Sequence, residues 1–591
     1  MKNFSKSLSL LLAIVMVLTL FTPILPSAAD VATSKTVTIL GTSDMHGRIF
    51  PWEYATGTAD DDAGFAIIQT LIKQEKEKNP NTILIDNGDT LQDNMAEIFN
   101  NDPVHPMIDV MNYMGYDVWN LGNHEFNFGM DFLNKNIAAF KGSALAANIY
   151  KEDGTRFING YKIIVKDGVR VAIVGLIAPH IPTWEAATPE HFKGLTFTDP
   201  VAEAKKVVKE LEGKYDVLIG TFHLGDTPEK GTTDGAKAVA DAVPQFNAII
   251  CGHAHSQFDN IESTSKVKLI EPGRYGAALA KIDVKVEKSG NGWKVVEVST
   301  KNLLTKGVTA DKDLTAKFKT VDDKSLAEAN KVVGYVTGDF IKKVDYITGA
   351  DKITTMPTAQ MEDNAVIDFI NEVQTYYSKA DISTAAFFKN DANLKAGPFM
   401  KKDVANIYMY DNTLMAVNIT GKNLKAYMEW SAGYYNQFRD GDLTISFNPN
   451  VRGYNYDMFS GIDYQIDVSK SVGSRIVNAK IKGQPIVDAN IYKMAVNNYR
   501  YGTLLTNKWI TDADKCYDSF AELGDAGRVR DLIVKYVQEV KRGKISPYID
   551  DNWKLIGYSF DAKLKGIADA KIKAGEIKVP TSFDGRTPNV K

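Results

Sequence analysis

Four short segments of the 591-residue chain carry side chains that bind metal ions in proteins, and every one of them contains a glycine. They are SDMHG at 43–47, DNGD at 86–89, GNHE at 122–125 and GHAH at 252–255. An Asp-x-His or His-x-His pair extends two side chains to the same side of an extended chain, and glycine lets the backbone turn sharply around an ion. A fifth candidate ligand, His223, follows an apolar run that ends at Phe222. The pattern indicates metal-assisted chemistry.

Together these loops offer seven nitrogen and oxygen ligands, namely Asp44, His46, Asp89, Asn123, His223, His253 and His255. A donor set without thiolate suits Zn, Mn, Fe or Co better than it suits a structural zinc site. One ion alone does not use seven ligands and keep a position open for water. We therefore expect two divalent ions, with Asp89 of the central loop between them. Asp86 and Glu125 are not needed to complete this set, and we interpret them as supporting residues.

The ligands follow segments that are predicted to be strands. Short β-branched runs alternate with helical patterns up to about residue 309, and this alternation is typical of an α/β fold. Ligands at the ends of several strands indicate a site at one edge of a layered sheet. All eight histidines lie in this part of the chain, which we take as an N-terminal domain over 30–309. The predicted strands are Thr36–Leu40, Thr82–Asp86, Val169–Leu176, Asp216–Phe222 and Ala248–Cys251.

The rest of the chain has a different character. Residues 310–331 are charged, lack Gly and Pro, and predict a connecting helix. Residues 332–560 contain no histidine and are predicted to form an α+β domain that binds substrate, while residues 561–591 predict a helix and a tail. The predicted elements of the second domain include strands at Met415–Ile419 and Asp463–Val468 and helices at Ala365–Ser378 and Lys422–Ser431.

The N-terminus and the composition bear on location and partners. Residues 1–29 place two lysines before an apolar run and end in small residues, the pattern of a signal peptide, so we expect a secreted or extracytoplasmic protein without a membrane anchor. With only Cys251 and Cys516, its stability cannot come from a disulfide framework. The formal net charge of −4 gives no basic surface for duplex nucleic acid or an anionic membrane. Any nucleotide that the protein binds is therefore expected to be a small molecule, and the protein is expected to be a monomer.

The ordered set of loops resembles the calcineurin-like metallophosphoesterases and, within them, the exported 5′-nucleotidase group with its own C-terminal domain. The resemblance implies a β-sheet sandwich flanked by helices for the first domain. It also implies one ion held by Asp44, His46, Asp89 and His255, and a second held by Asp89, Asn123, His223 and His253. His124, beside the ligand Asn123, matches the histidine that stabilises the transition state in this family.

Four further segments are similar to the 2′,3′-cyclic-nucleotide 2′-phosphodiesterase/3′-nucleotidase branch of this group: 105–129, 409–421, 461–476 and 497–500. Asn127 stands where 5′-nucleotidases of the group typically carry an aspartate, and we assign it with His124 to the catalytic residues. The resemblance implies that Tyr454 and Tyr499 stack on the base, with Tyr456 and Tyr501 as alternatives. The other implied substrate contacts are Arg500, Tyr501, Gly502, Thr503, Leu504 and Leu505. Arg452 and Arg500 are either phosphate contacts or solvated surface residues.

The expected reaction is hydrolysis of 2′,3′-cyclic nucleotides to 3′-nucleotides and then to nucleosides, with hydroxide generated by the two ions. His124 is expected to donate a proton or hydrogen bond as charge develops on oxygen. Closure of the two domains around 310–331 would complete the site. Two alternatives remain open. One is a 5′-nucleotidase or nucleotide-sugar hydrolase of the same family, and the other is an inactive nucleotide-binding surface protein that has kept the fold.

Overall fold

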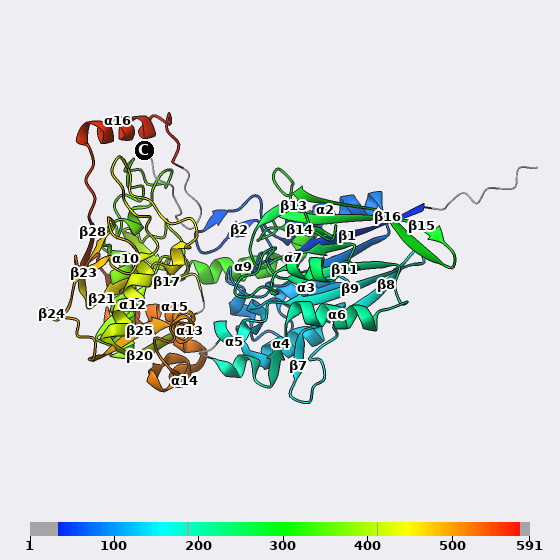
Figure 1. The fold of residues 1–591 in the computed structure, drawn as a ribbon, viewed down its shortest axis with the longest axis horizontal. Helices are drawn as coiled ribbons and strands as arrows, with labels where there is room; N and C mark the ends of the chain where they lie inside the picture. Colours follow the sequence, from blue (N-terminus) through cyan, green and yellow to red (C-terminus); the bar gives the residue numbers. More distant parts are fainter. Residues whose placement is uncertain (1–33, 186–187, 411, 580–591) are drawn as a thin grey trace, which may run out of the picture.

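The structure is a computed structural model that describes residues 34–579 except 186–187 and 411. It has an N-terminal and a C-terminal lobe, each built from helices and sheets (Figure 1). The buried apolar core of the N-terminal lobe draws on residues 37–318, and that of the C-terminal lobe on residues 333–579. The expected fold class, a layered α/β unit followed by an α+β unit, is confirmed. The predicted signal peptide, 1–29, and the tail from residue 580 lie outside the described residues.

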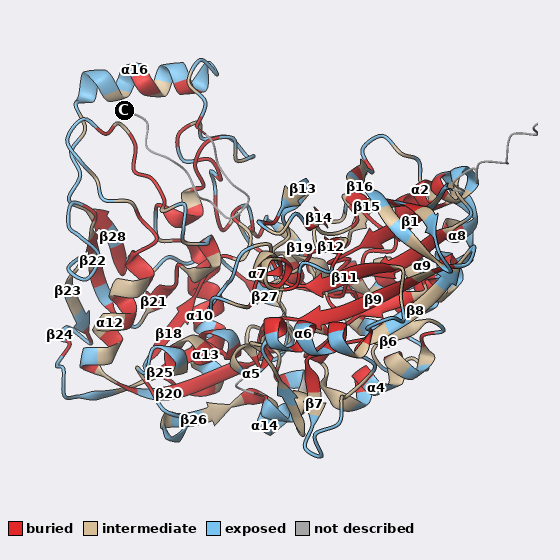
Figure 2. Cartoon of the chain, turned by 45° about the vertical axis from the view of Figure 1, so that its right-hand side comes forward, coloured by how far each residue is buried: buried red, intermediate tan, exposed pale blue. Residues whose placement is uncertain are grey.

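The N-terminal lobe is a sandwich of two six-stranded sheets whose buried faces meet (Figure 2). Val37 and Ile39 of one sheet pack with Val171 and Ile173 of the other. In each sheet the central strands are parallel, so their carboxyl ends lie at the same edge. The strand order of the first sheet is β16 (Gly292–Leu304), β15 (Ala278–Ser289), β1 (Ser34–Thr42), β4 (Thr82–Asp86), β5 (Val118–Asn120) and β6 (Ser143–Leu145). The strand order of the second sheet is β13 (Gln257–Glu262), β14 (Lys268–Pro272), β12 (Ala248–Ile250), β11 (Val217–His223), β9 (Val169–Ile177) and β8 (Tyr161–Lys166).

Helices cover the outer faces of both sheets. On the first sheet lie α2 (Phe65–Lys78), α3 (Pro106–Met114) and α4 (Gly129–Ala139). On the second lie α6 (Pro200–Glu210) and α7 (Ala236–Ala242). All five strands predicted for this part of the chain are present, with ends within about two residues of the expected positions. The expected sandwich flanked by helices is therefore confirmed.

The connecting segment differs from the prediction of one helix over 310–331. It forms two helices, α8 (Lys312–Lys317) and α9 (Lys319–Ala329), which meet at Phe318. Phe318 has a ψ of 11°, outside the helical range, and its ring is buried against Tyr113 of the N-terminal lobe. After this break α9 runs between the lobes (Figure 1), where Ala329 clusters with Tyr54 and Ala405. The break lets one segment bury apolar side chains in both lobes.

The C-terminal lobe contains three sheets around one core, and the strands and helices predicted within it are present. The five-stranded sheet has the order β21 (Met458–Ser460), β18 (Ile382–Ala385), β25 (Ile491–Asn497), β20 (Leu414–Thr420) and β26 (Lys515–Asp518). The four-stranded sheet has the order β24 (Gln484–Pro485), β23 (Ile476–Ile481), β22 (Asp463–Asp467) and β28 (Trp553–Ile556). The three-stranded sheet has the order β19 (Gly397–Met400), β17 (Val332–Val336) and β27 (Lys544–Ile545). Its main helices are α10 (Ala365–Ser378), α11 (Lys401–Ile407), α12 (Gly421–Ala432), α13 (Asn498–Thr506), α14 (Ser519–Leu523), α15 (Val529–Lys535) and α16 (Ala562–Lys573).

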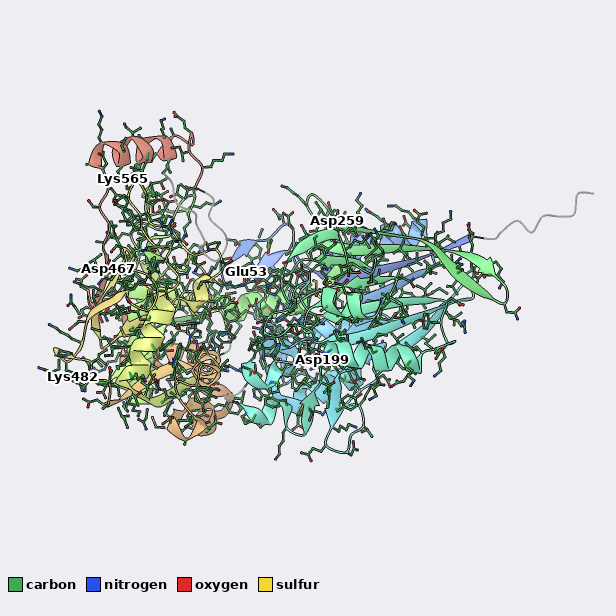
Figure 3. All side chains as sticks on the ribbon, viewed as in Figure 1. Glu53, Asp199, Asp259, Asp467, Lys482 and Lys565 are labelled. Atoms are coloured by element: carbon green, nitrogen blue, oxygen red, sulfur yellow. The ribbon has the colours of Figure 1, made fainter. Side chains whose placement is uncertain are left out.

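The surface and the cysteines agree with the composition. Charged side chains of both signs lie over the outside of the two lobes, as Asp199 and Asp259 on one and Lys482 on the other illustrate (Figure 3). Cys251 is buried as a small apolar residue, and Cys516 is exposed and free. Within residues 34–579, apart from 186–187 and 411, no helix combines the length and the apolar character that crossing a bilayer requires.

Three carboxyl groups of the C-terminal lobe, those of Asp363, Asp368 and Asp550, lie within 4.8 Å of one another. Burial and the neighbouring carboxylates raise the pKa of Asp363 to about 7 and that of Asp368 to about 8. These values lie above the unfolded value of about 4. At these two groups the folded chain therefore binds more protons than the unfolded chain between about pH 4 and pH 8, and their contribution to stability falls as the pH rises through that window.

Asp368→Asn is expected to raise the melting temperature at pH 8 by about 2 to 4 °C, because it removes a charge that the folded state disfavours. Toward pH 4 the gain should shrink, since Asp368 is then protonated in the folded state and largely so in the unfolded state. Thermal unfolding of parent and variant at both pH values measures this. Asp351→Asn, whose side chain is 85% exposed, is the matched control. An equal gain at both pH values would assign the effect to packing instead.

Candidate metal centre and substrate cavity

The five candidate loops lie at the carboxyl ends of β1, β4 and β5 in one sheet and of β11 and β12 in the other. Their backbone conformation is unusual. Five of the seven candidate ligands have positive φ, between 45° and 69°, in the left-handed region that costs free energy for side chains other than glycine. Such strain persists only where the surroundings hold it, and its concentration here indicates a functional site. The five residues are Asp44, His46, Asp89, His253 and His255.

Two glycines allow the loops to approach one another. A Cβ at Gly122 would lie 2.3 Å from Asp89 Oδ1, and one at Gly252 would lie 2.2 Å from Ser43 Oγ. Both distances are far shorter than a van der Waals contact. The glycines in GNHE and GHAH are therefore required because neighbouring ligand loops fill the space of a side chain.

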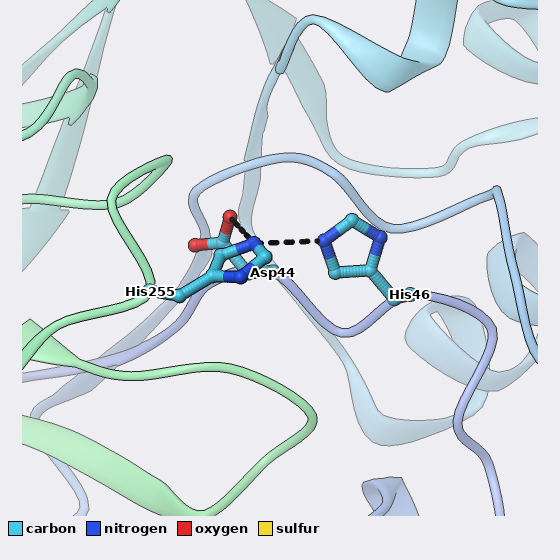
Figure 4. A group of neighbouring side chains, drawn as sticks. All are labelled: Asp44, His46 and His255. Atoms are coloured by element: carbon cyan, nitrogen blue, oxygen red, sulfur yellow. Dashed lines mark hydrogen bonds and ion pairs between the residues drawn. The ribbon is translucent and has the colours of Figure 1, made fainter. Parts of the chain in front are cut away.

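Asp44, His46 and His255 form the first group of ligands (Figure 4). The Nε2 atoms of His46 and His255 lie 3.2 Å apart, and His255 Nε2 lies 3.3 Å from Asp44 Oδ1. Burial lowers the pKa of His46 well below its ordinary value, so its ring is neutral and keeps a lone pair for an ion. Two imidazole nitrogens and a carboxylate oxygen that converge on one point fit a divalent cation.

Asp89, Asn123, His223 and His253 form the second group. His223 Nε2 lies 3.0 Å from Asp89 Oδ2 and 3.1 Å from Asn123 Oδ1. His253 approaches the same amide oxygen with Nδ1, at 2.8 Å. All the candidate ligands thus fall into two adjacent groups of nitrogen and oxygen donors, the arrangement expected for two divalent ions.

Contacts behind the ligands orient three of the imidazoles. His223 Nδ1 donates to the carbonyl oxygen of Asn87 at 2.8 Å, which leaves Nε2 as the donor atom for an ion. His46 Nδ1 lies 3.2 Å from Gln92 Oε1. His253 Nε2 lies 2.9 Å from Glu229 Oε2, so this ring would bind an ion through Nδ1. A hydrogen bond to the far nitrogen fixes both the tautomer and the ring plane.

Glu229→Ala is expected to weaken binding of the ion at the second group about 10- to 100-fold, because His253 loses the carboxylate that orients it. Competition with a chelator, followed by elemental analysis of the dialysed protein, measures the change. Glu297→Ala, an exposed acidic residue on β16, serves as the control for loss of charge. Equal metal retention by both variants would contradict a role for Glu229.

Glu125 and Asp86 support the loops instead of facing the ligand groups. Glu125 accepts backbone N–H bonds from Asp89 and Gly122 at 2.8 and 2.7 Å and thereby ties two ligand loops together. Asp86 accepts from the hydroxyl groups of Thr42 and Thr90 at 2.7 and 2.5 Å. Burial raises the pKa of Asp86 to about 7. Both carboxyl groups are bonded within the loops, which agrees with the supporting role expected for them.

His124 lies between the ligand groups and a cavity. Its backbone N–H donates to Asp89 Oδ1 at 2.8 Å, and its ring centroid lies 5.3 Å from that of His46. Its Nδ1 is 2.7 Å from Asn127 Oδ1. With Nδ1 engaged in this way, Nε2 is the atom available to a substrate. The two residues predicted as catalytic are thus in direct contact.

A cavity of about 710 Å³ lies between the lobes, and both lobes contribute to its lining. Asp89, Asn123, His124 and His253 line it from the N-terminal lobe. The C-terminal lobe contributes Phe388, Tyr410, Asn412, Arg452, Tyr454, Tyr499, Phe520 and Arg528. The volume suits a ligand of nucleotide size. Metal ligands and aromatic side chains therefore face one space.

Tyr454 and Tyr499 line this cavity as expected, but their relative orientation differs from a parallel sandwich. The ring centroids are 6.3 Å apart, and the planes meet at 84°. In this arrangement one ring can stack on a flat base while the other presents its edge. Tyr456 is buried and stacks on Tyr434, so it is excluded as an alternative base contact.

The residues after Tyr499 do not line the cavity, and this corrects the expectation for them. They belong to α13, which turns its successive side chains in different directions. Tyr501 is buried and donates to Asp512 Oδ1 at 2.8 Å, and Leu504 is buried in the core. Gly502 packs against the N-terminal lobe, where an added Cβ would lie 2.6 Å from the carbonyl oxygen of Thr183. The residues displaced from the expected role are Arg500, Tyr501, Gly502, Thr503, Leu504 and Leu505.

Arg500 acts behind the cavity. It is buried, pairs with Asp457 at 2.6 Å, and donates to the backbone carbonyl of Tyr454 at 2.9 Å. Its guanidinium also lies 5.8 Å from the ring centroid of Tyr499. Arg500 therefore holds both tyrosines in place, while Arg452 is the arginine of the predicted pair that lines the cavity.

Several lining residues escaped prediction. Trp184, Glu185 and Phe520 belong to segments with no recognisable motif. Tyr410 and Asn412 lie within 409–421, a segment already singled out for its resemblance, and this was the one signal that pointed to them.

Two family models match the chain. The model described as calcineurin-like phosphoesterase matches residues 37–257, and the model described as 5′-nucleotidase, C-terminal domain, matches residues 333–504. The first match covers every candidate metal ligand. The second covers Tyr410, Tyr454 and Tyr499, the tyrosines named above in the cavity lining.

Curated relatives and a solved structure agree with these matches. The trifunctional nucleotide phosphoesterase protein YfkN of Bacillus subtilis is 28% identical over 93% of this chain, which spans 41% of YfkN's length. The 2′,3′-cyclic-nucleotide 2′-phosphodiesterase/3′-nucleotidase of Salmonella typhimurium is 26% identical over 92% of each chain. A putative 5′-nucleotidase from Staphylococcus aureus has a similar fold, with a TM-score of 0.73 at 23% identity, over 88% of this chain and all of that one.

Proposed function

Because the chain belongs to the calcineurin-like metallophosphoesterases that carry a 5′-nucleotidase C-terminal domain, we propose that it hydrolyses 2′,3′-cyclic nucleotides to 3′-nucleotides and then to nucleosides. The observation that carries the proposal is the shared cavity, which joins two groups of metal ligands to an aromatic surface. Relatives named for this activity from three bacteria cover 89 to 92% of the chain at 25 to 27% identity.

The two ligand groups are proposed to hold two divalent ions, which supply Lewis acidity and positive charge for attack of water on phosphorus. Zn, Mn, Fe and Co all suit these donors. Asp89 is the proposed bridge, since Oδ2 faces the second group and its charge acts on His46 of the first. Asn123 completes the second group and, through its position in the chain, brings His124 beside the ions.

His124 is proposed to act on oxygen during ring opening. Nδ1 is bonded to Asn127, so the Nε2 side is free to face a bound phosphate or its leaving oxygen. Water adds to phosphorus and the bond from phosphorus to the 2′ oxygen breaks. His124 delivers the proton on its Nε2 to that oxygen, and the proton that the water loses replaces it. The product keeps its phosphate on the 3′ oxygen. The same residues can then act on the 3′ ester, with the nucleoside as leaving group.

The base is proposed to lie against Tyr454 and Tyr499, with Arg500 holding both. Stacking contributes about 1–3 kcal/mol per base and tolerates different bases. Tyr499→Ala is expected to raise KM for a cyclic nucleotide by about 5- to 100-fold. KM for bis(p-nitrophenyl) phosphate, which has no base, should not change. Steady-state kinetics on both substrates tests this, with Tyr548→Ala, a change at a 71% exposed tyrosine, as the control. A parallel rise for both substrates would contradict base recognition.

The activity test combines elemental analysis with product analysis on purified protein. We expect close to two ions per chain, release of 3′-AMP from 2′,3′-cyclic AMP, and then adenosine. Faster hydrolysis of 5′-AMP would favour the 5′-nucleotidase alternative, since a relative from Vibrio cholerae named 5′-nucleotidase is 33% identical over 37% of the chain. Absence of metal-dependent hydrolysis of both would favour an inactive nucleotide-binding protein.

The remaining features of the proposal concern the whole protein. We propose export through the signal peptide at 1–29, no membrane anchor, and a monomer that binds small nucleotides and not duplex nucleic acid. N-terminal sequencing of protein recovered outside the cytoplasm tests export, with a mature N-terminus near Asp30 as the expected result. Light scattering of the purified protein tests the monomer.

A further inference from the structure

Asn127 is bonded on both sides, and the two bonds together fix the orientation of its amide. Asn127 Oδ1 lies 2.7 Å from His124 Nδ1, and Asn127 Nδ2 donates to Glu185 Oε1 at 2.7 Å. An ionised carboxylate only accepts hydrogen bonds, so the NH₂ group of the amide must face Glu185. The amide oxygen then faces His124 and accepts from Nδ1–H. Glu185 thereby ensures that Nδ1 of His124 carries a hydrogen.

Glu185 is itself held in place. It follows α5 (Ile181–Trp184) and is buried, with 8% of its surface exposed. Its second oxygen, Oε2, accepts from Thr188 Oγ1 at 3.0 Å and lies 3.1 Å from His191 Nδ1. The other lobe adds a restraint, because Phe520 packs edge-on against the His191 ring at 5.5 Å. Both carboxylate oxygens are therefore engaged, and the path from His191 to His124 is continuous.

We propose that Glu185 is a positioning residue that, through Asn127, keeps a hydrogen on Nδ1 of His124 and holds Nε2 toward the cavity. This inference rests on the proposed function, since it concerns the same histidine. In a direct His–Asp pair the carboxylate contacts the histidine itself. Here the amide of Asn127 lies between the Glu185 carboxylate and His124, so the carboxylate orients the amide and the amide orients the ring. A negative charge is kept out of direct contact with a ring that lies beside the metal ligands.

The arrangement predicts that the acid and the amide can exchange places between positions 127 and 185, but that both positions cannot carry an acid. Asn127→Asp alone puts two carboxylates in contact where the structure has a 2.7 Å hydrogen bond, and it should lower kcat about 10- to 100-fold. In the double variant Asn127→Asp/Glu185→Gln, the carboxylate now at position 127 accepts from His124 and from the amide now at position 185. The oxygen of that amide accepts from Thr188 and His191. Every bond has a donor and an acceptor again, and we expect kcat within about threefold of the parent.

Glu185→Ala completes the test. It should lower kcat about 10- to 100-fold and leave KM within about twofold, with close to two ions per chain retained, since Glu185 touches no metal ligand. Glu190→Ala, an exposed carboxylate in the same loop, is the matched control and should behave like the parent. If Glu185 had a purely structural role, both single variants would lose activity because they fold poorly, and the double variant would not recover kcat.

The outcomes separate this inference from the function on which it rests. All variants are assayed on 2′,3′-cyclic AMP and on bis(p-nitrophenyl) phosphate. If the parent hydrolyses only the aryl ester, the proposed substrate is wrong. The recovery of kcat in the double variant can still be measured on that ester. Glu185→Ala with parental kcat, or a double variant no faster than Asn127→Asp, overturns the positioning role whichever substrate is used.

Discussion

Asp89→Asn is expected to leave the protein folded while abolishing most of its metal-dependent activity, with a loss of about 10³-fold or more in kcat/KM and fewer than two ions per chain. The variant isolates charge. Asparagine tolerates the left-handed φ of 53° as aspartate does, and its Oδ1 can still accept the His124 N–H bond that Asp89 accepts at 2.8 Å. What disappears is the anionic oxygen facing His223.

The charge of Asp89 also governs the proton that an ion must displace. Burial opposes protonation of His223, but Asp89 raises the pKa of His223 to about 10. Metal uptake by the parent is therefore expected to release a proton from this ring and to strengthen as the pH rises. In Asp89→Asn the pKa of His223 should fall, so that less proton release accompanies whatever metal still binds. Calorimetric titration in buffers of different ionisation enthalpy measures the difference.

A buried aspartate far from the ligands provides the control for Asp89. Asp345 accepts backbone N–H bonds from Thr354 and Thr355 at 2.7 and 2.8 Å, so Asp345→Asn should lower the melting temperature without lowering metal content per folded chain. If Asp89→Asn bound two ions and turned over like the parent, the proposed bridge between the two groups would be wrong.

The convergence of the candidate metal ligands could be predicted from the sequence because local rules determine where their loops begin. Buried β-branched runs end where Gly, Asn and Asp begin, and β4 and α10 have the predicted ends. Parallel neighbours bring three of these ends to one edge of the first sheet and two to one edge of the second, so the packing of the two sheets is the further contact that makes the five loops converge. The left-handed φ values of the candidate ligands could not be predicted from the sequence, in which the only related feature is the glycine beside them.

The predictions differ from the structure where contacts between distant segments determine the position of a residue. The break at Phe318 accompanies a ring contact with Tyr113, about 200 residues earlier, and helical periodicity across 310–331 contains no sign of that contact. Arg500 and the five residues after it were expected in the cavity with Tyr499. In a helix, however, neighbouring residues point about 100° apart, so Tyr499 lines the cavity while the others pack elsewhere. Glu185 reaches Asn127 across 58 residues, and no spacing rule connects them.

These contacts also tie the site to the position of the lobes. Gly502 packs on Thr183 of α5, and Phe520 packs on His191, so the segment that carries Glu185 lies against the C-terminal lobe. The cavity tyrosines belong to the same lobe. In the proposed function, substrate recognition and the orientation of His124 would therefore depend on one interface, which would give domain closure a physical route to His124.

His124→Ala is expected to lower kcat about 10²- to 10⁴-fold while close to two ions per chain remain bound, because His124 belongs to neither ligand group. KM should change little, since base contacts lie in the other lobe. His105→Gln is the matched control. His105 is fully buried and bonded to the Ala96 carbonyl at 3.1 Å, so its loss should affect stability and not turnover per folded chain.

The double variant His124→Ala/Glu185→Ala makes the argument quantitative. If Glu185 acts only through His124, then removing Glu185 from a chain that already lacks His124 should cost no further activity, and the two losses should fail to add. Additive losses would mean that Glu185 supports the site by another route. Loss of metal in His124→Ala would instead show that this histidine holds an ion, and the separation of roles between His124 and its neighbour Asn123 would have to be abandoned.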